Sequence, residues 1–204
     1  VFARERELRG DAEEAERLLR SVLARAEEDG KVAVRSKRLL AWCLVRRGLL
    51  DAATVLLREL LVTLDSLDDP AALGAALRDL AVVSMQRGEY EDALFLCAEA
   101  RKAYGSAGLL SGVALANSST GEIYRMQGRY VEAEKTYRKV RDGMLQLGNK
   151  GYLVAELNMG LAFLGQKDFG AASKLLERSA EVFEKDGQGL PEMVARAGLS
   201  VVAA

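Results

Sequence analysis

The amino-acid sequence predicts an all-α protein, a right-handed α-solenoid of antiparallel helix hairpins with about five repeats plus a terminal helix. The first observation is a cassette in which a turn residue is followed five positions later by alanine. It recurs at intervals of 38, 40, 40 and 39 residues, with alanines at Ala15, Ala53, Ala93, Ala133 and Ala172. The second observation is the helical i, i+4 spacing of apolar residues, without strand-like alternation. The third is glycine and proline punctuation at the same period.

Each cassette is interpreted as the turn between the first and the second helix of one hairpin. We expect first helices over 1–9, 32–47, 70–87, 109–127, 150–166 and 190–204. We expect second helices over 11–29, 50–67, 90–107, 130–147 and 169–187. Both prolines, Pro70 and Pro191, lie near the start of a first helix, where a missing N–H costs nothing.

The turn residues explain where the first helices end. Gly48, Gly88 and Gly128 occupy the position where a left-handed residue terminates a helix, and glycine is favoured there. Lys167 occupies the same position without that freedom, so either this turn is strained or the helix ends earlier, at Gly165. The expected loop before the fourth first helix is Gly105–Gly112, followed by tight helix packing around Ser118; a neutral polar pocket there is the alternative interpretation.

Small residues should allow each pair of helices to pack closely. Seven residues before each turn residue stands alanine or glycine, at Ala3, Ala41, Ala81, Gly121 and Gly160. We expect these residues to face the cassette alanines, while Tyr90, Tyr130 and Phe169 fill the space beside the turns. The register predicts one solenoid domain over 1–204, a fragment of a longer protein, with repeats at about 1–30, 31–68, 69–108, 109–148, 149–188 and a partial one at 189–204.

Composition excludes several classes of function. The 204 residues include 29 Lys plus Arg and 30 Asp plus Glu, so no global basic field favours nucleic acid. There is no histidine, which removes histidine-based catalysis and the commonest zinc ligand. Cys43 and Cys97 stand in apolar helical stretches and are interpreted as reduced core thiols, although a disulfide stays open. We predict a cytoplasmic, non-enzymatic domain with no catalytic residue, metal, cofactor or membrane contact.

The segment 117–137 contains Gly121, Tyr124, Gly128, Tyr130 and Ala133 in an order that resembles the tetratricopeptide repeat. The resemblance extends over the chain, with weaker first repeats that lack the turn aromatic. The period near 40 exceeds the usual 34 residues. It is similar to the long repeats of kinesin light chains and bacterial signalling proteins, which implies a surface for peptides, proteins or small inducers.

The groove lined by first helices is the expected binding surface. Arg35, Arg38, Trp42 and Arg46 share one stripe; Arg78 and Val82, then Glu122 and Arg125, occupy corresponding positions in later repeats. Two guanidinium groups beside an indole would suit a carboxylate or an acidic peptide. The alternative, solvated arginines with Trp42 packed on their stems, stays open.

These features predict a protein- or peptide-binding scaffold domain of a larger, bacterial-type signalling or regulatory protein. The alternative is a small-molecule sensor domain of a repeat-containing transcription regulator, signalling ATPase or kinase. The preferred partner is a protein or peptide, acidic in character. Self-association through apolar terminal helices is a further expectation.

Overall fold

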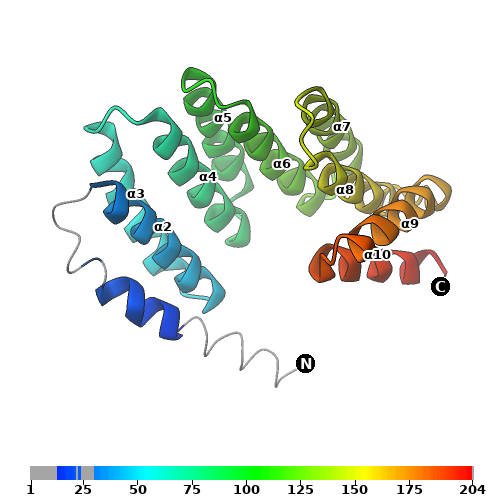
Figure 1. Cartoon of the computed structure of the whole chain (residues 1–204), viewed down its shortest axis with the longest axis horizontal. Coiled ribbons are helices and arrows are strands. Elements are labelled where there is room, and N and C mark those ends of the chain that lie inside the picture. Colours follow the sequence, from blue (N-terminus) through cyan, green and yellow to red (C-terminus); the bar gives the residue numbers. More distant parts are fainter. Residues whose placement is uncertain (1–12, 22, 24–29, 204) are drawn as a thin grey trace. The chain divides into compact units, whose positions relative to one another are not determined.

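The computed structural model describes residues 13–21, 23 and 30–203, and these residues form helices and short turns with no β-strand. Residues 13–21 are helical, which agrees with the expected second helix over 11–29, whereas the expected helix over 1–9 lies outside the described residues. The remaining helices are shown in Figure 1: α2 (Gly30–Arg46), α3 (Leu50–Asp65), α4 (Pro70–Gln86), α5 (Tyr90–Ser106), α6 (Leu110–Met126), α7 (Tyr130–Gln146), α8 (Tyr152–Gly165), α9 (Phe169–Lys185) and α10 (Gly189–Val202). The all-α repeat prediction is confirmed, and helix ends differ from the expected ones by about two residues.

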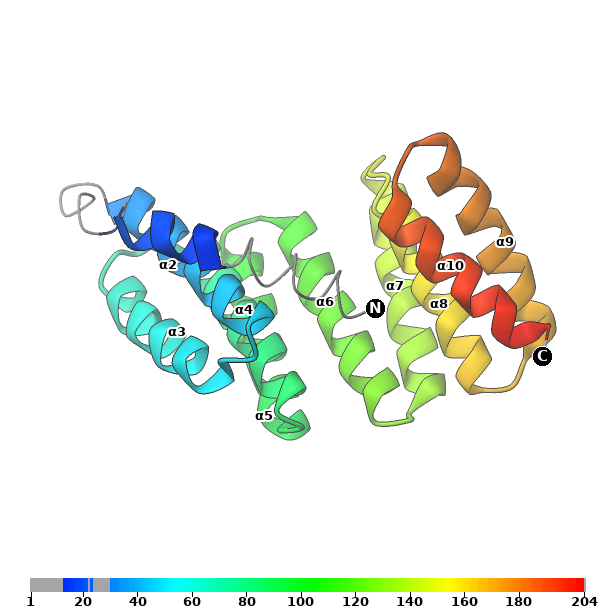
Figure 2. The same ribbon diagram turned by 90° about the horizontal axis from the view of Figure 1, so that it is seen from below.

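The chain divides into two compact units, Val1–Gly112 and Val113–Ala204, and the boundary falls inside α6. In the first unit, α2 packs on α3, α3 on α4 and α4 on α5. In the second unit, α7, α8, α9 and α10 pack in sequential order, and Figure 2 shows these four helices side by side. Each unit is therefore a stack in which every helix contacts its neighbours along the chain. The prediction of one domain over 1–204 stays a prediction.

The turns inside the hairpins have a repeated backbone geometry. Gly48, Gly88 and Gly128 have φ of 77°, 80° and 74°, as predicted for residues that end a helix in the left-handed region. Lys167 has φ of 61° in the same slot, and α8 ends two residues earlier, as the other first helices do. Both alternatives therefore hold: α8 ends at Gly165, and Lys167 adopts a conformation that favours glycine.

The turns between hairpins repeat as well, which the sequence analysis did not identify. Their left-handed residues are Asp68, Gly108, Gly148 and Gly187, with φ of 47°, 65°, 61° and 65°. The expected loop over Gly105–Gly112 is shorter than predicted, because α5 continues to Ser106 and α6 begins at Leu110. Gly112 belongs to α6 and packs tightly, as discussed below.

Two of the small residues in the first helices, Gly121 and Gly160, are in close contact with large side chains of the second helices. A Cβ placed on Gly121 would lie 2.7 Å from Tyr137 Cε1, and one placed on Gly160 would lie 2.9 Å from Leu176 Cδ2. Tyr137 and Leu176 each stand four residues after the cassette alanine. The two helices approach closely at these glycines, as predicted, and the absence of a side chain there makes room for a bulky residue of the second helix.

Two of the turn aromatics, Tyr130 and Phe169, differ in their surroundings. Tyr130 packs on Gly165, the last residue of α8, where an added Cβ would lie 2.3 Å from its ring. The aromatic therefore contacts the end of the next hairpin's first helix. Phe169, at the equivalent position in α9, is 46% exposed and is not a core residue.

Candidate functional site

The predicted groove residues fall into both units. Six of them lie on α2 and α4 in the first unit, namely Arg35, Arg38, Trp42, Arg46, Arg78 and Val82. The other two, Glu122 and Arg125, lie on α6 in the second unit. The structure brings Arg38 and Arg78 together on a shared partner, which is the centre of the candidate site.

That partner is Asp79, which the sequence analysis missed. Arg38 donates from Nε to Asp79 Oδ2 at 2.7 Å, and Arg78 donates from Nη2 to Oδ1 at 3.1 Å. Asp79 is only 2% exposed. A carboxylate removed from water in this way requires charged hydrogen-bond partners, and the two arginines supply them.

The carboxylate of Asp79 therefore already occupies the anion site that the sequence predicted at Arg38 and Arg78. The cluster carries two positive charges against one negative charge, so a net positive charge is left for a ligand. The Arg38 and Arg78 side chains are 27% and 22% exposed, and Arg78 Nε is buried without a hydrogen-bond partner in the described part of the chain. Asp79 fixes the two guanidinium groups and reduces the positive charge that they present.

Trp42 lies against the same cluster. It is half-buried and borders a small space with Asp79, Val83 and Leu57, so the indole faces α4 rather than open solvent. Val82 is half-buried and Arg46 is exposed. A cation–π contact does occur in the protein, but between Arg129 and Tyr124, with 4.4 Å from the guanidinium carbon to the ring centroid.

Beside the cluster, α2 forms one wall of a cavity of about 930 Å³. Lys31, Arg35 and Arg38 make this wall basic. Asp68 and Asp69, in the turn between α3 and α4, form an acidic wall, and the lining also contains apolar residues, namely Val34, Leu64, Leu67, Pro70 and Ala72. The cavity is therefore bipolar, and it lies wholly within the first unit.

On α6, Glu122 and Arg125 bind each other instead of presenting separate charges. Arg125 Nε donates to Glu122 Oε2 at 2.9 Å, and the Tyr137 hydroxyl donates to the same oxygen at 3.0 Å. Burial opposes ionisation of Glu122, but hydrogen bonding and attraction from Arg125 outweigh it, so the pKa of Glu122 is lowered. Burial, with the Glu122 charge, raises the pKa of Tyr137. This group is a closed network of satisfied partners.

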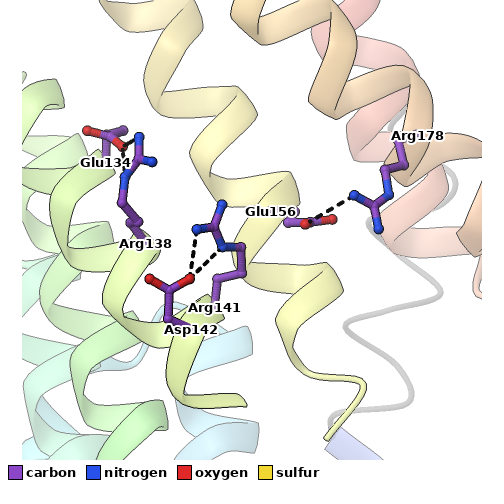
Figure 3. A network of polar contacts seen from close by, with 6 residues as sticks. All are labelled: Glu134, Arg138, Arg141, Asp142, Glu156 and Arg178. Atoms are coloured by element: carbon purple, nitrogen blue, oxygen red, sulfur yellow. Dashed lines mark hydrogen bonds and ion pairs between the residues drawn. The ribbon is translucent and has the colours of Figure 1, made fainter. Parts of the chain in front are cut away.

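Two buried acids in the second unit, Glu134 and Glu156, are neutralised in a similar manner. Figure 3 shows them with their partners Arg138 and Arg178 and with the pair formed by Arg141 and the exposed Asp142. Glu134 is 9% exposed and accepts from Arg138 Nε at 2.8 Å, one helical turn away in α7. Glu156 is 6% exposed and accepts from Arg178 Nη1 of α9 at 3.4 Å. Three acids and three arginines leave this network with no net charge.

A sequence signal for the missed acids exists. Asp79 stands in Leu77–Met85 and Glu156 in Tyr152–Gly165, and each is the only acidic residue of its segment. Hydrophobic first helices are buried along much of their length, so a lone acid there needs an internal cation. The arginine that supplies it comes from a neighbouring helix, which helical periodicity alone does not reveal.

The described residues contain no group of three or more His, Cys, Asp and Glu side chains that could hold a metal ion. Neither Cys43 nor Cys97 is in a disulfide bond, and burial raises the pKa of Cys43. None of the helices described combines the length and apolar character needed to cross a bilayer.

The stacked hairpins and their repeated turns define an α-helical repeat protein, a class whose surfaces serve binding. Tetratricopeptide repeat models match residues 112–185 and residues 2–69, which together make up more than half of the chain. The chain belongs to the tetratricopeptide repeat family. This confirms the resemblance drawn from the segment 117–137.

Solved structures agree with this assignment. BtubC (BKLC) from P. vanneervenii has a TM-score of 0.69 at 19% identity, covering 96% of this chain and 89% of that one. A putative kinesin light chain from Podosopora anserina with nearly identical repeats has a TM-score of 0.65 at 17% identity, covering 90% and 93%. At such identities the similarity establishes the fold. No curated protein gives a significant sequence match.

A third similar structure is a Rap protein in complex with Competence and Sporulation Factor. Its TM-score is 0.63 at 17% identity, and the match covers 97% of this chain but 59% of the Rap chain.

Proposed function

We propose that this chain is a protein- or peptide-binding scaffold domain of a larger bacterial signalling or regulatory protein that acts in the cytoplasm. Family membership supports a binding surface, because stacked helical repeats create extended faces for partners. The Rap protein was solved in complex with Competence and Sporulation Factor, so a similar fold accommodates a bound factor in that protein. The proposed binding residues are Arg35, Arg38, Trp42, Arg46, Arg78 and Val82 on α2 and α4 of the first unit, and Glu122 and Arg125 on α6 of the second unit.

One observation carries the proposal: Asp79 holds Arg38 and Arg78 in fixed positions beside Trp42. Binding to a fixed guanidinium avoids much of the entropy cost of ordering a flexible side chain. Two arginines against one aspartate leave a net positive charge, which favours an acidic partner.

The test uses random peptides displayed on phage and selected on the protein. Trp42 is the only tryptophan, so its emission reports binding beside the cluster, and calorimetry gives an independent affinity. We expect enriched peptides to be acidic and to bind Trp42→Ala at least tenfold more weakly. Lys139→Glu, on an exposed position of α7, is the matched control and should bind as the unchanged protein does. Selected peptides that bind both variants equally would refute the proposed surface.

The cavity of about 930 Å³ supports a second candidate, a small-molecule sensor, because its size suits a metabolite. A thermal-unfolding screen with carboxylic acids and amino acids distinguishes the two candidates. Stabilisation by one such compound, together with an absence of selected peptides, would favour the sensor.

Self-association through α10 is also proposed. Leu190, Val194, Ala197 and Val201 lie on one face of this helix, and the three large side chains are 73%, 37% and 57% exposed. A second copy that covers this face would bury apolar area. Light scattering at two protein concentrations should show a rising mean mass, and Val201→Glu should remove the rise.

A further inference from the structure

We propose that the cavity between α2 and the α3–α4 turn recognises a short peptide segment in which apolar residues separate an acidic residue from a basic one. The inference rests on the proposed peptide-binding function and adds the location and the sequence chemistry of the ligand. The cluster of Arg38, Arg78 and Asp79 lies beside this cavity, and the residues that line the cavity would contact the peptide.

The basic wall would bind the acidic side chain of the peptide. Lys31, Arg35 and Arg38 are spaced i, i+4 and i+7, so they project from one face of α2. Arg35 is exposed and forms no hydrogen bond or ion pair with a described residue. Arg38 has its Nε committed to Asp79 and still lines the cavity, so its position is set before a ligand arrives. Paired guanidinium groups suit a carboxylate, since each can donate two hydrogen bonds.

The acidic wall would bind the basic side chain. Asp69 Oδ1 accepts the Ala72 N–H at 2.9 Å, which caps α4 and commits this carboxylate to the fold. Asp68 is exposed at the left-handed turn position, with φ of 47°, and lines the cavity. Asp68 is therefore the carboxylate that meets a ligand cation. A purely anionic ligand would be repelled by it, which gives selectivity as well as attraction.

The apolar lining residues would hold the middle of the peptide. Leu64 is 2% exposed and Leu67 48%, so the lining includes both buried and open apolar surface. A volume of about 930 Å³ is near the upper end of typical ligand pockets and exceeds what a free amino acid fills. The size, the apolar lining and the opposite charges supplied by two different elements together favour a peptide over a metabolite.

The experiment uses the full chain and three probe peptides: acetyl-Glu-Leu-Leu-Lys-amide, the same peptide with Gln in place of Glu, and the same peptide with Gln in place of Lys. Backbone amide shifts in NMR locate each peptide, and their concentration dependence gives the affinity. We expect the first peptide to shift amides of α2 and of the α3–α4 turn. Replacing its Glu should weaken binding about tenfold, and replacing its Lys about threefold, because one wall loses its ion pair in each case.

Variants of the protein show which wall of the cavity binds which side chain of the peptide. Arg35→Glu should weaken the first peptide at least tenfold, whereas Arg58→Glu, an exposed arginine of α3 away from the cavity, should leave it within twofold. Asp68→Asn should weaken the Lys-containing peptides and leave the peptide without Lys unchanged. NMR spectra of each variant show whether it is folded, and Arg38 is left intact because it also holds Asp79.

Three results would overturn the inference: no shifts in the cavity residues, equal affinity of the Glu and Gln peptides, or no loss in Arg35→Glu. Tighter binding of free glutamate than of the peptides would also overturn it in favour of a metabolite. Failure of the scaffold function looks different. In that case peptides selected by display would ignore Trp42→Ala, while the probes would still bind the cavity in an Arg35-dependent manner.

Discussion

Each unit contains a large side chain that lies between two glycines, but this side chain is an aromatic ring in the first unit and an aliphatic chain in the second. In the first unit, Tyr104 of α5 lies between Gly74 of α4 and Gly112 of α6, where added Cβ atoms would lie 2.9 Å and 2.3 Å from its ring. In the second unit, Leu176 of α9 lies between Gly160 and Gly198, at 2.9 Å and 2.8 Å from its methyl carbons. The two bulky residues occupy different positions of the repeat, 11 residues after Ala93 and four residues after Ala172, and they differ in how far the side chain can move to accommodate an added methyl group.

The arginine that neutralises a buried carboxylate also comes from different places in the two cases compared. Asp79 is held by Arg38 from another helix, 41 residues away in sequence, whereas Glu134 is held by Arg138 within its own helix. The second unit uses both kinds of contact, because Tyr137 also lies against Gly121 and Glu156 is held by Arg178 of another helix. The comparison therefore concerns individual sites. We expect substitutions at the rigid Tyr104 ring and at the Arg38–Asp79 pair to cost more than those at the aliphatic Leu176.

The largest expected effect is that of Gly112→Ala. The new methyl group would meet the Tyr104 ring, which cannot bend away, so overpacking should lower the free energy of unfolding by about 3 kcal/mol. Urea denaturation measures the change. Gly105→Ala is the control, because its Cβ would meet nothing within 4 Å and alanine favours the helix by about 1 kcal/mol. Restoration of stability by Tyr104→Leu in the Gly112→Ala protein would confirm the ring as the cause.

Arg38→Ala should follow in size. It leaves the buried Asp79 with Arg78 as its remaining partner, and removing one member of a buried pair costs several kcal/mol, so we expect a loss of about 2–3 kcal/mol. Arg58→Ala, at an exposed position of α3, should change stability by less than about 0.5 kcal/mol. Asp79→Leu added to Arg38→Ala should recover part of the loss, since no buried carboxylate is left. An unchanged urea midpoint in Arg38→Ala would contradict the structural role given to the pair.

Gly160→Ala tests whether the site of Leu176 tolerates an added methyl group better than the site of Tyr104 does. Its new methyl group would meet Leu176 Cδ2 at 2.9 Å, and a leucine side chain can shift by a small rotation about its own bonds. We expect a loss of about 1 kcal/mol, measured in urea under the same conditions as for Gly112→Ala. Equal losses for the two variants would show that the nature of the seated residue does not decide the tolerance.

The sequence predicted the repeat well because helix turns leave local signals. Gly88 and Gly128 mark left-handed turns, and the start of α4 at Pro70 can be predicted from the residues next to it in the sequence. The site was predicted less well. Arg38 and Arg78 were correctly placed one repeat apart, but Asp79 was missed because its burial depends on α2, which is distant in sequence. The contact of Gly121 with Tyr137 was also not predicted, since spacing shows which residues are small and not which bulky residue lies against them.

Lys167→Gly should stabilise the second unit. Lys167 has φ of 61°, a conformation in which a Cβ is unfavourable, whereas Gly128 takes the same position at 74° without strain. We expect a gain of about 0.5–1 kcal/mol after the higher chain entropy of glycine is subtracted. The reverse exchange, Gly128→Lys, should cost a similar amount, as thermal unfolding of both variants will show. A loss in Lys167→Gly would mean that the lysine side chain makes a compensating contact.

The smallest effect concerns pH and Glu122. Its pKa is lowered in the folded protein because hydrogen bonding and attraction from Arg125 outweigh burial, so folding favours the ionised form. The resulting stability is present above the unfolded pKa of about 4.3 and is lost as the pH falls through the lower folded value. Glu122→Gln should therefore be less stable than the unchanged protein by less than about 1 kcal/mol at pH 7, with a difference that shrinks below about pH 4. Glu59→Gln, at an exposed position of α3, should show no such trend in urea denaturation at the two pH values. A difference for Glu122→Gln that does not change with pH would assign its effect to the hydrogen bond from Tyr137 alone.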